Sequence, residues 1–548
     1  MDTETIIMGA GPAGLQMAYF LQKEGRPYCI LERAGAAASF YEQFPHSGKL
    51  LSVNKVHTGE HGSYEKALRY DWNSLLNDEH ISFPSYSGEY YPAREDFVRY
   101  MNDFAKRFKL DIRYHHTVKG VQKEADGSYR LEVDVSGGAV TATCKRLILA
   151  TGLSKPRLPQ NWLNQTKVSP KHYADYPTNT FRTRKGLEPF RNKSVLIVGN
   201  GNAAYELAKL LVPWAAHILI YGSRPTPWAA ATHYPGHLRA NYLSIVDDCS
   251  FSNLQAIDTS LEGTLCIEQL AAADPYTVYT LCSPSCHAKH MLSPKHTFDH
   301  VIFATGRGFD ASPFQFQIPT LYDGKLPLLT PEFEVIGHPN LFCIGSLMHG
   351  FDYKEGTGGF LHGYRHLIQY MMGVHYTKKL SITTIKKGVD QMVELVNRIL
   401  QRINTDAALF SLHGYMSDVV YYHTEKGEYV YVNGLPMNCL QNVLRATPAN
   451  TTVFQLTLEY GRPVKESPHE FGTVNTVSSE PALANLLHPV IRVIRARKRV
   501  LMEKGQGQQD PLPELVEIVH FAEAPFAEFT HRDAIVTKLF RLFKGYLP

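Results

Sequence analysis

The fold of this 548-residue chain is decided by residues 5–33, TIIMGAGPAGLQMAYFLQKEGRPYCILER. The segment reads as an apolar strand, a glycine turn, a helix and a second apolar strand. Its turn has the spacing GxGxxG, in which the first glycine permits the tight turn and the second lets the backbone approach a pyrophosphate. The third glycine lets helix and strand pack closely, so that the phosphates meet the positive end of the helix. We expect the turn to hold a dinucleotide through Gly9, Gly11, Pro12, Ala13 and Gly14.

The second strand of this unit ends in Glu32, about 20 residues beyond the glycines. A carboxylate at that position accepts hydrogen bonds from ribose hydroxyls. Arg33 follows directly and is either a contact of the adenosine side or a solvated surface arginine. With both strands, the helix and the acid in register, we interpret the unit as a binding site for FAD.

The same arrangement recurs at residues 194–224, SVLIVGNGNAAYELAKLLVPWAAHILIYGSR. The turn there is GxGxxA, and we expect cofactor contacts from Gly199, Gly201, Asn202 and Ala204. Its second strand ends in Ser223 and Arg224 instead of an acid. A hydroxyl and a guanidinium can bind the extra phosphate of NADPH, which an acid would repel. Unless the Ser-Arg pair is an incidental surface turn, the second cofactor is NADPH.

The repeat organises the first two-thirds of the chain. Each unit is followed by an apolar strand that ends in Ala-Thr-Gly, at residues 147–152 and 301–306. The expected fold class is α/β, with two Rossmann-like dinucleotide-binding domains and a C-terminal α+β region that begins with an amphipathic helix and continues as short strands and loops. We place the FAD-binding domain at 1–160 and 305–375, the NADPH-binding domain at 161–304 and the C-terminal domain at 376–548.

Composition excludes several classes of protein. A net charge of +4 is small for this length, and the one basic run, residues 492–504, is interpreted as a solvated helix face, so no nucleic acid partner is expected. No apolar stretch reaches the roughly 20 residues of a membrane span, and the first strand starts too early for a signal peptide. Neither cysteine nor histidine spacing predicts a metal site, although Cys282 and Cys286 are close enough to form a redox pair. A cytoplasmic protein is expected.

Two further segments carry a resemblance to the class B flavin-dependent monooxygenases, within the two-dinucleotide-binding flavoprotein superfamily. AAASFYEQFP (36–45) is similar to the family's segment that places residues against the flavin, which implies flavin contacts from Ser39 and Phe40. The run from His172 to Pro177 resembles the end of the family fingerprint. Thr166 and Val168 replace the Phe and Gly that precede it in the family.

Longer stretches resemble a branch that holds the endoplasmic-reticulum flavoprotein associated with degradation and bacterial amino-acid N-monooxygenases. They lie at residues 10–22, 50–59, 71–76, 228–240, 351–365, 458–462 and 487–491. Because the sequence shows neither a signal sequence nor a retention signal, the resemblance points to the cytosolic enzymes of the branch. It implies an NADPH-consuming enzyme that hydroxylates an amine of a small metabolite through a flavin C4a-hydroperoxide.

The resemblance also assigns candidate roles around the flavin. Asn54 is the expected hydrogen-bond donor beside it, with Lys55 adjacent, unless Asn54 only forms a turn. Substrate contacts are expected from His233, Tyr234 and Arg239, or this loop instead binds the nicotinamide half of NADPH. The remaining candidate flavin contacts are Trp72, Asn73, Thr151, Gly152, Thr305, Gly306, Asp352, Gly358, Gly359 and His362, unless either Ala-Thr-Gly is purely structural.

These features favour an FAD- and NADPH-dependent monooxygenase that N-hydroxylates an amine, such as that of an amino acid. The expected partners are a small-molecule amine and molecular oxygen, without a metal, and the sequence allows a homodimer. Two alternatives stay open. One is an NADPH-dependent flavoprotein reductase acting on a protein or disulfide partner, and the other is a non-catalytic module that senses redox state.

Overall fold

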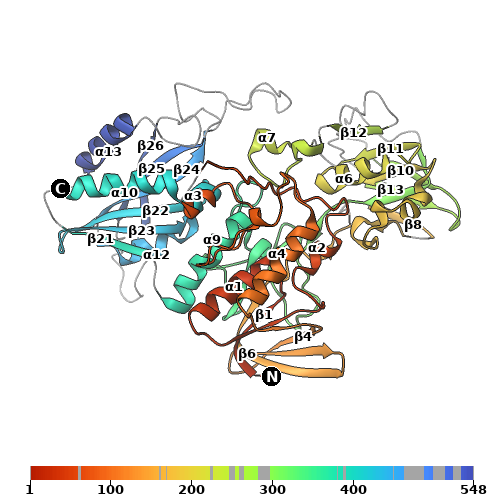
Figure 1. The fold of residues 1–548 in the computed structure, drawn as a ribbon, viewed down its shortest axis with the longest axis horizontal. Helices are drawn as coiled ribbons and strands as arrows, with labels where there is room; N and C mark the ends of the chain where they lie inside the picture. The colour runs from red at the N-terminus through yellow and green to blue at the C-terminus, as the bar shows by residue number, and fades with distance from the viewer. Residues whose placement is uncertain are drawn as a thin grey trace.

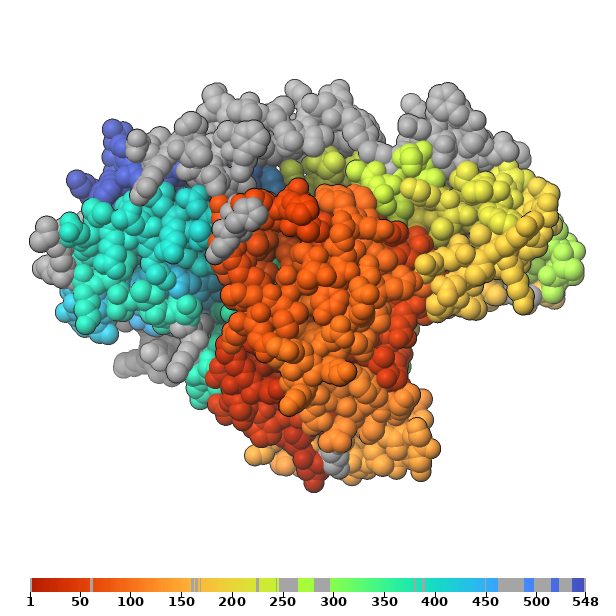
Figure 2. All heavy atoms as spheres, viewed as in Figure 1, coloured from red at the N-terminus to blue at the C-terminus, as the bar shows by residue number. Residues whose placement is uncertain are grey.

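The computed structural model forms three regions side by side (Figure 1). In Figure 2 the red and orange N-terminal residues lie at the centre, with the yellow second unit on one side and the cyan C-terminal region on the other. The structure describes residues 2–59, 63–158, 162–167, 169–222, 226–242, 244–245, 254–257, 264–281, 296–378, 381–386, 390–448, 450–461, 487–497, 512–521 and 532–546.

The central region contains a seven-stranded sheet in the order β3-β2-β1-β6-β5-β4, with β20 paired to β6. β1, β2, β3, β6 and β20 are parallel, whereas β4 and β5 extend the sheet as antiparallel strands. Because β20 comes from beyond the second glycine unit, the chain returns to this sheet late. The strands are β1 (Asp2–Met8), β2 (Tyr28–Leu31), β3 (Ile112–Arg113), β4 (Thr117–Lys123), β5 (Tyr129–Val135), β6 (Gly138–Leu149) and β20 (Leu341–Cys343).

Helices α1, α4 and α9 lie against this sheet, and each is largely buried along its apolar residues (Figure 1). They span Pro12–Lys23, Arg94–Arg107 and Leu361–Met372. The second region has a five-stranded parallel sheet, β12-β11-β10-β16-β9, beside a four-stranded sheet, β15-β14-β13-β8. Its elements are β8 (Trp162–Thr166), β9 (Lys171–His172), β10 (Ser194–Val198), α6 (Asn202–Leu211), β11 (His217–Tyr221), β12 (Leu254–Ile257), β13 (Thr264–Gln269), β14 (Tyr276–Leu281), β15 (His296–Phe298) and β16 (His300–Phe303).

The two regions are joined by two crossing segments that pair with each other. β7 (Lys155–Pro156) leaves the first region, and β17 (Arg307–Gly308) returns to it as its antiparallel partner. Farther along, Glu206 of α6 accepts hydrogen bonds from the main-chain N–H of Ser47 at 2.7 Å and from the hydroxyl of Tyr173. The predicted fold class, two Rossmann-like units with a C-terminal α+β region, is confirmed.

The C-terminal region is a six-stranded sheet in the order β21-β23-β22-β24-β25-β26, and all its neighbouring strands are antiparallel. Its strands are β21 (Ser381–Ile385), β22 (Met416–His423), β23 (Glu428–Pro436), β24 (Thr452–Tyr460), β25 (Leu487–Arg497) and β26 (Leu512–His520). Its helices are α10 (Gln391–Thr405), α11 (Ala407–Ser411), α12 (Leu440–Ala446) and α13 (Arg532–Tyr546).

Two expectations for this region were wrong. Its strands are long, with 11 residues in β25, and residues 492–497 of the basic run belong to that strand instead of to a helix face. Val493 and Ala496 are buried there, whereas Arg492 and Arg495 are more accessible. A strand turns successive side chains to opposite faces, so basic residues interleaved with apolar ones suit it as well as a helix surface. Residues 498–504 of the run lie outside the described residues.

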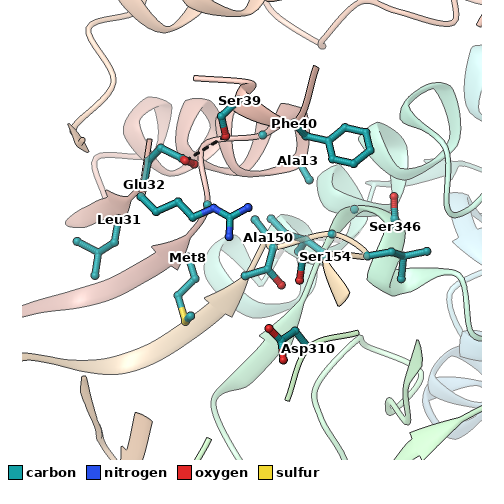
Figure 3. Close-up of a pocket in the computed structure, with 18 of the residues that line it drawn as sticks. Met8, Ala13, Leu31, Glu32, Ser39, Phe40, Ala150, Ser154, Asp310 and Ser346 are labelled. Atoms are coloured by element: carbon teal, nitrogen blue, oxygen red, sulfur yellow. Dashed lines mark hydrogen bonds between the residues drawn. The ribbon is translucent and has the colours of Figure 1, made fainter. Parts of the chain in front are cut away.

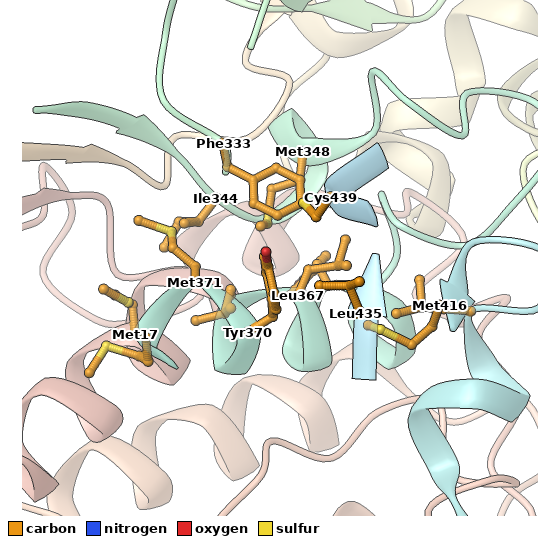
Figure 4. Packing of buried hydrophobic residues seen from close by; sticks show 14 of the residues in the cluster. Met17, Phe333, Ile344, Met348, Leu367, Tyr370, Met371, Met416, Leu435 and Cys439 are labelled. Carbon is orange, nitrogen blue, oxygen red and sulfur yellow. The ribbon is translucent and has the colours of Figure 1, made fainter. Parts of the chain in front are cut away.

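Helix α9 joins the C-terminal region to the central sheet. In Figure 4 its Leu367, Tyr370 and Met371 lie between Met17 of α1 on one side and Met416 and Leu435 of the C-terminal sheet on the other. All these side chains are buried in one continuous cluster, so the two regions share a core.

Buried polar contacts fix the same junction. Arg69 donates hydrogen bonds to the main-chain oxygens of Ile403 at 2.8 Å and Asp406 at 3.2 Å. Arg365 of α9 donates to the oxygens of Ser74 and Leu68, both at 2.8 Å. The segment that carries Trp72 is therefore held both by α9 and by the C-terminal region.

Across the parts of the chain that the structure describes, no helix is both long enough and apolar enough to cross a membrane.

Candidate functional site

A cavity of about 480 Å³ lies where the glycine turn of the first unit meets the ends of β1, β2 and β6 (Figure 3). We call it the first cavity. Ten of the predicted cofactor residues line it: Gly9, Gly11, Pro12, Ala13, Glu32, Arg33, Ser39, Phe40, Thr151 and Gly152. These ten residues come from four separate segments of the chain, which the fold brings to one cavity.

The three glycines of the turn have different surroundings. Gly9 has φ of +106°, and a Cβ there would lie 2.9 Å from the carbonyl oxygen of Ala150. A Cβ on Gly14 would overlap the carbonyl oxygen of Gly9, whereas one on Gly11 would meet no protein atom within 4 Å. Gly11 caps α1 without a side-chain hydrogen bond, and no acid stands in the first turn of the helix. The positive helix end is left free for an anion.

Glu32 has a second role that the sequence did not reveal. Its carboxylate accepts hydrogen bonds from the main-chain N–H groups of Ala10 at 2.8 Å and Ala34 at 2.9 Å. It also accepts one from the hydroxyl of Ser39 at 3.2 Å, drawn as a dashed line in Figure 3. Because a carboxylate has about four acceptor sites, these three hydrogen bonds leave room for the ribose contact that we predicted.

Arg307 was missed as a site residue. Its Nη2 donates to the carbonyl oxygen of Ser154 at 3.0 Å, and its guanidinium lies over the rings of Phe40 and Phe44, at 5.4 and 4.7 Å from their centroids. Its Nε and Nη1 are buried without a partner. Burial lowers the pKa of Arg307, and the charge of Arg33 lowers it further. Arg307 and Arg33 place two cations at this cavity, which suits the phosphates of FAD.

We expect Arg307→Met to weaken FAD binding by roughly tenfold, because about 1.5 kcal/mol of charge-assisted hydrogen bonding is lost. Flavin fluorescence titration of the apoprotein measures the change. Arg99→Ala, which removes an exposed arginine of α4, serves as the control and should leave the affinity unchanged. Equal affinities for wild type and the Arg307 variant would show that this arginine does not contact the cofactor.

A second cavity of about 360 Å³ continues from the first. The two share Tyr41, Leu153, Ser346 and Tyr364. Seven predicted site residues line the second cavity: Trp72, Asn73, Asn202, Tyr234, Arg239, Gly359 and His362. Trp72 and Gly359 belong to the central region, whereas Asn202 and Arg239 belong to the second glycine unit, so the cavity lies between the two units.

Arg239 is the main charged group of the second cavity. Its Nη1 donates to the carbonyl oxygen of Leu51 at 2.9 Å, and its guanidinium lies 5.2 Å from the ring centroid of Trp72. Burial lowers its pKa. Within the described ranges, neither aspartate nor glutamate lines the cavity, while Lys325 adds a second cation. The cavity is therefore electropositive and suits an anionic group.

The loop that carries Arg239 is fixed to the second glycine turn. Asn202, the first residue of α6, donates from Nδ2 to the carbonyl oxygen of His237 at 2.8 Å and accepts from the main-chain N–H of Arg239 at 2.9 Å. The ring of His362 stacks on Trp72, the same ring that Arg239 approaches, with 4.4 Å between centroids. The cationic and aromatic groups thus have fixed positions before any ligand binds.

The second glycine turn repeats the geometry of the first. Gly199 has φ of +121°, and a Cβ there would overlap the carbonyl oxygen of Ala304. A Cβ on Gly201 would meet nothing within 4 Å, and α6 begins there without a side-chain cap. Ala204 is fully buried. Ser223 and Arg224, on which the choice of NADPH rests, lie outside the described residues, as do Cys282 and Cys286.

Asn54 and Lys55 do not line either cavity. The buried amide of Asn54 donates to the carbonyl oxygens of Ser87 at 2.6 Å and Glu89 at 3.3 Å, and Lys55 is exposed. With its two N–H groups used by the main chain, Asn54 has no donor left for a flavin. The structure places Asn54 in an isolated β-bridge with Asp71 instead of a turn, and its position away from both cavities does not support the predicted role as catalytic donor.

The other predicted contacts that lie away from the cavities have structural roles. The hydroxyl of Thr305, the residue before Gly306, donates a hydrogen bond to the carbonyl oxygen of Arg157. Asp352 accepts from the main-chain N–H of Gly358 at 2.6 Å. His233 stacks on Tyr460 of the C-terminal sheet with 3.7 Å between centroids. His362, which the sequence analysis singled out, lines the second cavity, and the lining residues that it missed include Tyr41, Leu153, Arg307, Gly345, Ser346, Lys325, His349 and Tyr364.

A protein-family model described as pyridine nucleotide-disulphide oxidoreductase matches residues 6–345. Over 578 residues the chain is 29% identical to FAD-dependent oxidoreductase domain-containing protein 2 of Mus musculus, covering 99% of this chain and 83% of that protein. It is 28% identical over 211 residues to the probable indole-3-pyruvate monooxygenase YUCCA8 of Arabidopsis thaliana, covering 37% and 43% of the two chains. A solved ornithine N-hydroxylase from Kutzneria sp. 744 is similar with a TM-score of 0.49 and 13% identity, covering 69% of this chain and 100% of that one.

Proposed function

Because the chain belongs to the pyridine nucleotide-disulphide oxidoreductase family, we propose that it is an FAD-dependent, NADPH-consuming monooxygenase that N-hydroxylates an amino acid or a similar small amine. The balanced reaction takes the amine, oxygen, NADPH and a proton to the hydroxylamine, water and NADP⁺. The observation that carries this proposal is the second cavity, which opens on the first and lies between the two nucleotide-binding units. It holds an arginine, and no carboxylate of the described residues lines it.

The chemistry that FAD would supply here is that of a flavin, which takes up a hydride and reacts with oxygen in its reduced form. The chain itself would hold FAD through the glycine turn, Glu32, Arg33 and Arg307, which line the first cavity. It would hold NADPH at the second glycine turn, where Gly199 and Gly201 leave the helix end free.

The lining of the second cavity suits a substrate with an acidic and an apolar part. Arg239 is placed to bind a substrate carboxylate, since a guanidinium pairs with carboxylates through two parallel hydrogen bonds. Leu50, Phe97, Phe360 and Leu361 line the same space and limit the access of water to the reacting atoms. An amino acid offers the carboxylate together with an amine at a fixed distance.

The first test is steady-state turnover of the purified holoenzyme with NADPH or NADH and a panel of L-ornithine, L-lysine and putrescine. We expect NADPH oxidation to be faster with one of these amines, with a hydroxylamine product in near-equal amount. NADPH oxidation that yields only hydrogen peroxide with every amine would contradict the N-hydroxylase, and a preference for NADH would contradict the choice of nicotinamide cofactor.

A flavoprotein reductase for a disulfide partner needs a pair of cysteines beside the flavin. The five described cysteines, Cys29, Cys144, Cys266, Cys343 and Cys439, are buried and form no disulfide, and none of these five lines either cavity. This alternative therefore rests on Cys282 and Cys286. Replacing both with serine would abolish NADPH-linked disulfide reduction if they form the redox pair and would leave amine hydroxylation intact.

A further inference from the structure

Beside the second cavity, two buried polar side chains face each other. His349 lines the cavity and is only 6% exposed, and Asp352 lies behind it at 4%. The Nε2 atom of His349 is 3.8 Å from Oδ1 of Asp352, and each of these two atoms is buried without a hydrogen-bond partner. Unpaired buried polar atoms are costly, so a pair of them at a cavity wall indicates a function.

The pair is held by its surroundings. The other carboxylate oxygen of Asp352 accepts the hydrogen bond from Gly358 N–H at 2.6 Å, and there is no room for a Cβ on Gly356 or Gly358. The imidazole of His349 lies among the rings of Tyr234, Tyr353 and Phe360, with centroids 5.5 to 5.6 Å away. The glycines of this loop thus enclose Asp352, and the three aromatic rings enclose His349.

We propose that His349 and Asp352 form a proton-accepting pair that takes up the proton which an ammonium substrate must lose in the second cavity. This inference rests on the proposed N-hydroxylation, because only a neutral amine has the lone pair that the reaction needs. It adds a catalytic residue, His349, and a positioning residue, Asp352, that the glycine motifs do not suggest.

The proton transfer is balanced within the chain. Neutral His349 accepts the substrate proton on the ring nitrogen opposite Asp352 and gives its Nε2 proton to Oδ1 of Asp352. The ammonium becomes an amine, the carboxylate becomes a carboxylic acid, and the imidazole changes only its tautomer. The 3.8 Å separation shortens to a hydrogen bond as substrate fills the cavity, which is common where catalytic groups tighten on binding.

The protonation states agree with these roles. Burial lowers the pKa of His349 to about 4, so this imidazole is neutral and able to accept a proton. Burial also raises the pKa of Asp352 to about 7, with Glu355 adding to the shift, so this carboxyl changes state near neutral pH. The other titratable groups that face the pair are Lys325, Tyr234, Tyr322, Tyr353 and Tyr415.

The electrostatics of the cavity favour the transfer as well. Arg239 and Lys325 line the same space, where the described residues include no carboxylate. A positive environment disfavours the ammonium form of a bound amine and therefore lowers the amine's pKa. Asp352, just behind the wall, is a carboxyl on which the released proton can settle.

His349→Gln and Asp352→Asn test the pair in the holoenzyme. We expect each to reduce the kcat of amine hydroxylation about 100-fold, the usual range for a lost general base, while the rate of flavin reduction by NADPH stays unchanged. The base form of Asp352 predominates above about pH 7, so wild-type kcat should fall as pH falls through that value. The His349 variant should lose this dependence. Glu188→Gln, which neutralises an exposed carboxylate of the second region, is the control.

The outcomes separate this inference from the proposed function. If wild type hydroxylates an amine and both variants keep its kcat and pH profile, the proton-accepting pair is wrong and the proposed function stands. If wild type hydroxylates no amine, an acid–base titration still tests the pair. The number of protons taken up by the oxidised wild-type holoenzyme is compared with the number taken up by the Asp352→Asn holoenzyme. One extra proton taken up by wild type as the pH falls through about 7 supports the pair, and no difference overturns it.

Asparagine in place of Asp352 keeps an oxygen for the Gly358 N–H, so the loop is expected to remain folded. If that variant nevertheless fails to retain FAD, the His349 variant carries the kinetic test, because it leaves the Gly358 hydrogen bond untouched.

Discussion

Replacing Gly14 with alanine (G14A) is expected to abolish FAD retention and to lower the free energy of unfolding by about 3 kcal/mol. The added methyl would overlap the carbonyl oxygen of Gly9, and it would also press on the side chain of Ala150 at 3.4 Å. Neither neighbour can move easily, since both belong to the strand ends that form the first cavity. Thermal unfolding and flavin absorbance after desalting measure the two effects.

Gly11→Ala is the matched control for this prediction. A Cβ on Gly11 meets no protein atom within 4 Å and occupies the space in front of the end of α1. We expect the apoprotein to unfold at the wild-type temperature, while FAD binds at least about tenfold more weakly because the methyl takes the place of a phosphate contact. Normal FAD affinity of the Gly11→Ala variant would show that the cofactor does not approach this turn.

Arg239→Ala is expected to raise the KM of an amino-acid substrate by about 10- to 100-fold. This range corresponds to the roughly 1.5–3 kcal/mol of a hydrogen bond between charged groups. The effect should depend on the substrate: with putrescine, which has no carboxylate, the variant and the wild type should have similar KM values. Steady-state kinetics with L-ornithine and putrescine measure both.

The same experiment decides between the two roles left open for the loop around Arg239. If Arg239 binds the nicotinamide half of NADPH, its loss raises the KM of NADPH and affects both amines equally. Arg99→Ala, which removes an arginine whose side chain is 58% exposed, controls for a general loss of positive charge. An unchanged KM for both L-ornithine and NADPH would show that Arg239 contacts neither the substrate nor NADPH.

The C-terminal region contacts segments that flank the second cavity, although the described residues that line it belong to the other two regions. Trp72 is carried by a segment that Arg365 and Arg69 hold through main-chain carbonyls, and Arg69 reaches the helices of the C-terminal region. His233, beside Tyr234 of the cavity, stacks on Tyr460 of the C-terminal sheet. We infer that the C-terminal region stabilises the wall of the cavity.

The glycine turns were predictable because their requirements are local. Gly9 and Gly199 adopt positive φ, and the space around Gly11 and Gly201 depends only on a strand, a turn and a helix that follow one another. Glu32 lies at a fixed distance along the same unit. Such features depend on neighbouring residues, so their spacing in the sequence is sufficient to identify them.

The basic run shows the limit of local patterns. Arg492 and Arg495 alternate with apolar residues, a pattern that suits a helix surface and a strand alike. The antiparallel pairing of β25 with β24 makes this segment a strand. Within it, the side chain of Arg492 donates a hydrogen bond to the carboxylate of Glu459. Asn54 likewise has the residue type of a donor, but its N–H groups face the carbonyl oxygens of Ser87 and Glu89, which no spacing in the sequence reveals.

The sequence by itself determined the two nucleotide-binding units, the fold class and ten residues of the first cavity, because each depends on a short strand–turn–helix segment. Only the tertiary structure decided that Arg307 faces the same cavity as Gly9, that Arg239 and Trp72 meet in a second cavity, and that His349 lies against Asp352. The physical reason is that a binding site is a property of side-chain direction and burial, which are set when segments far apart in the chain pack together.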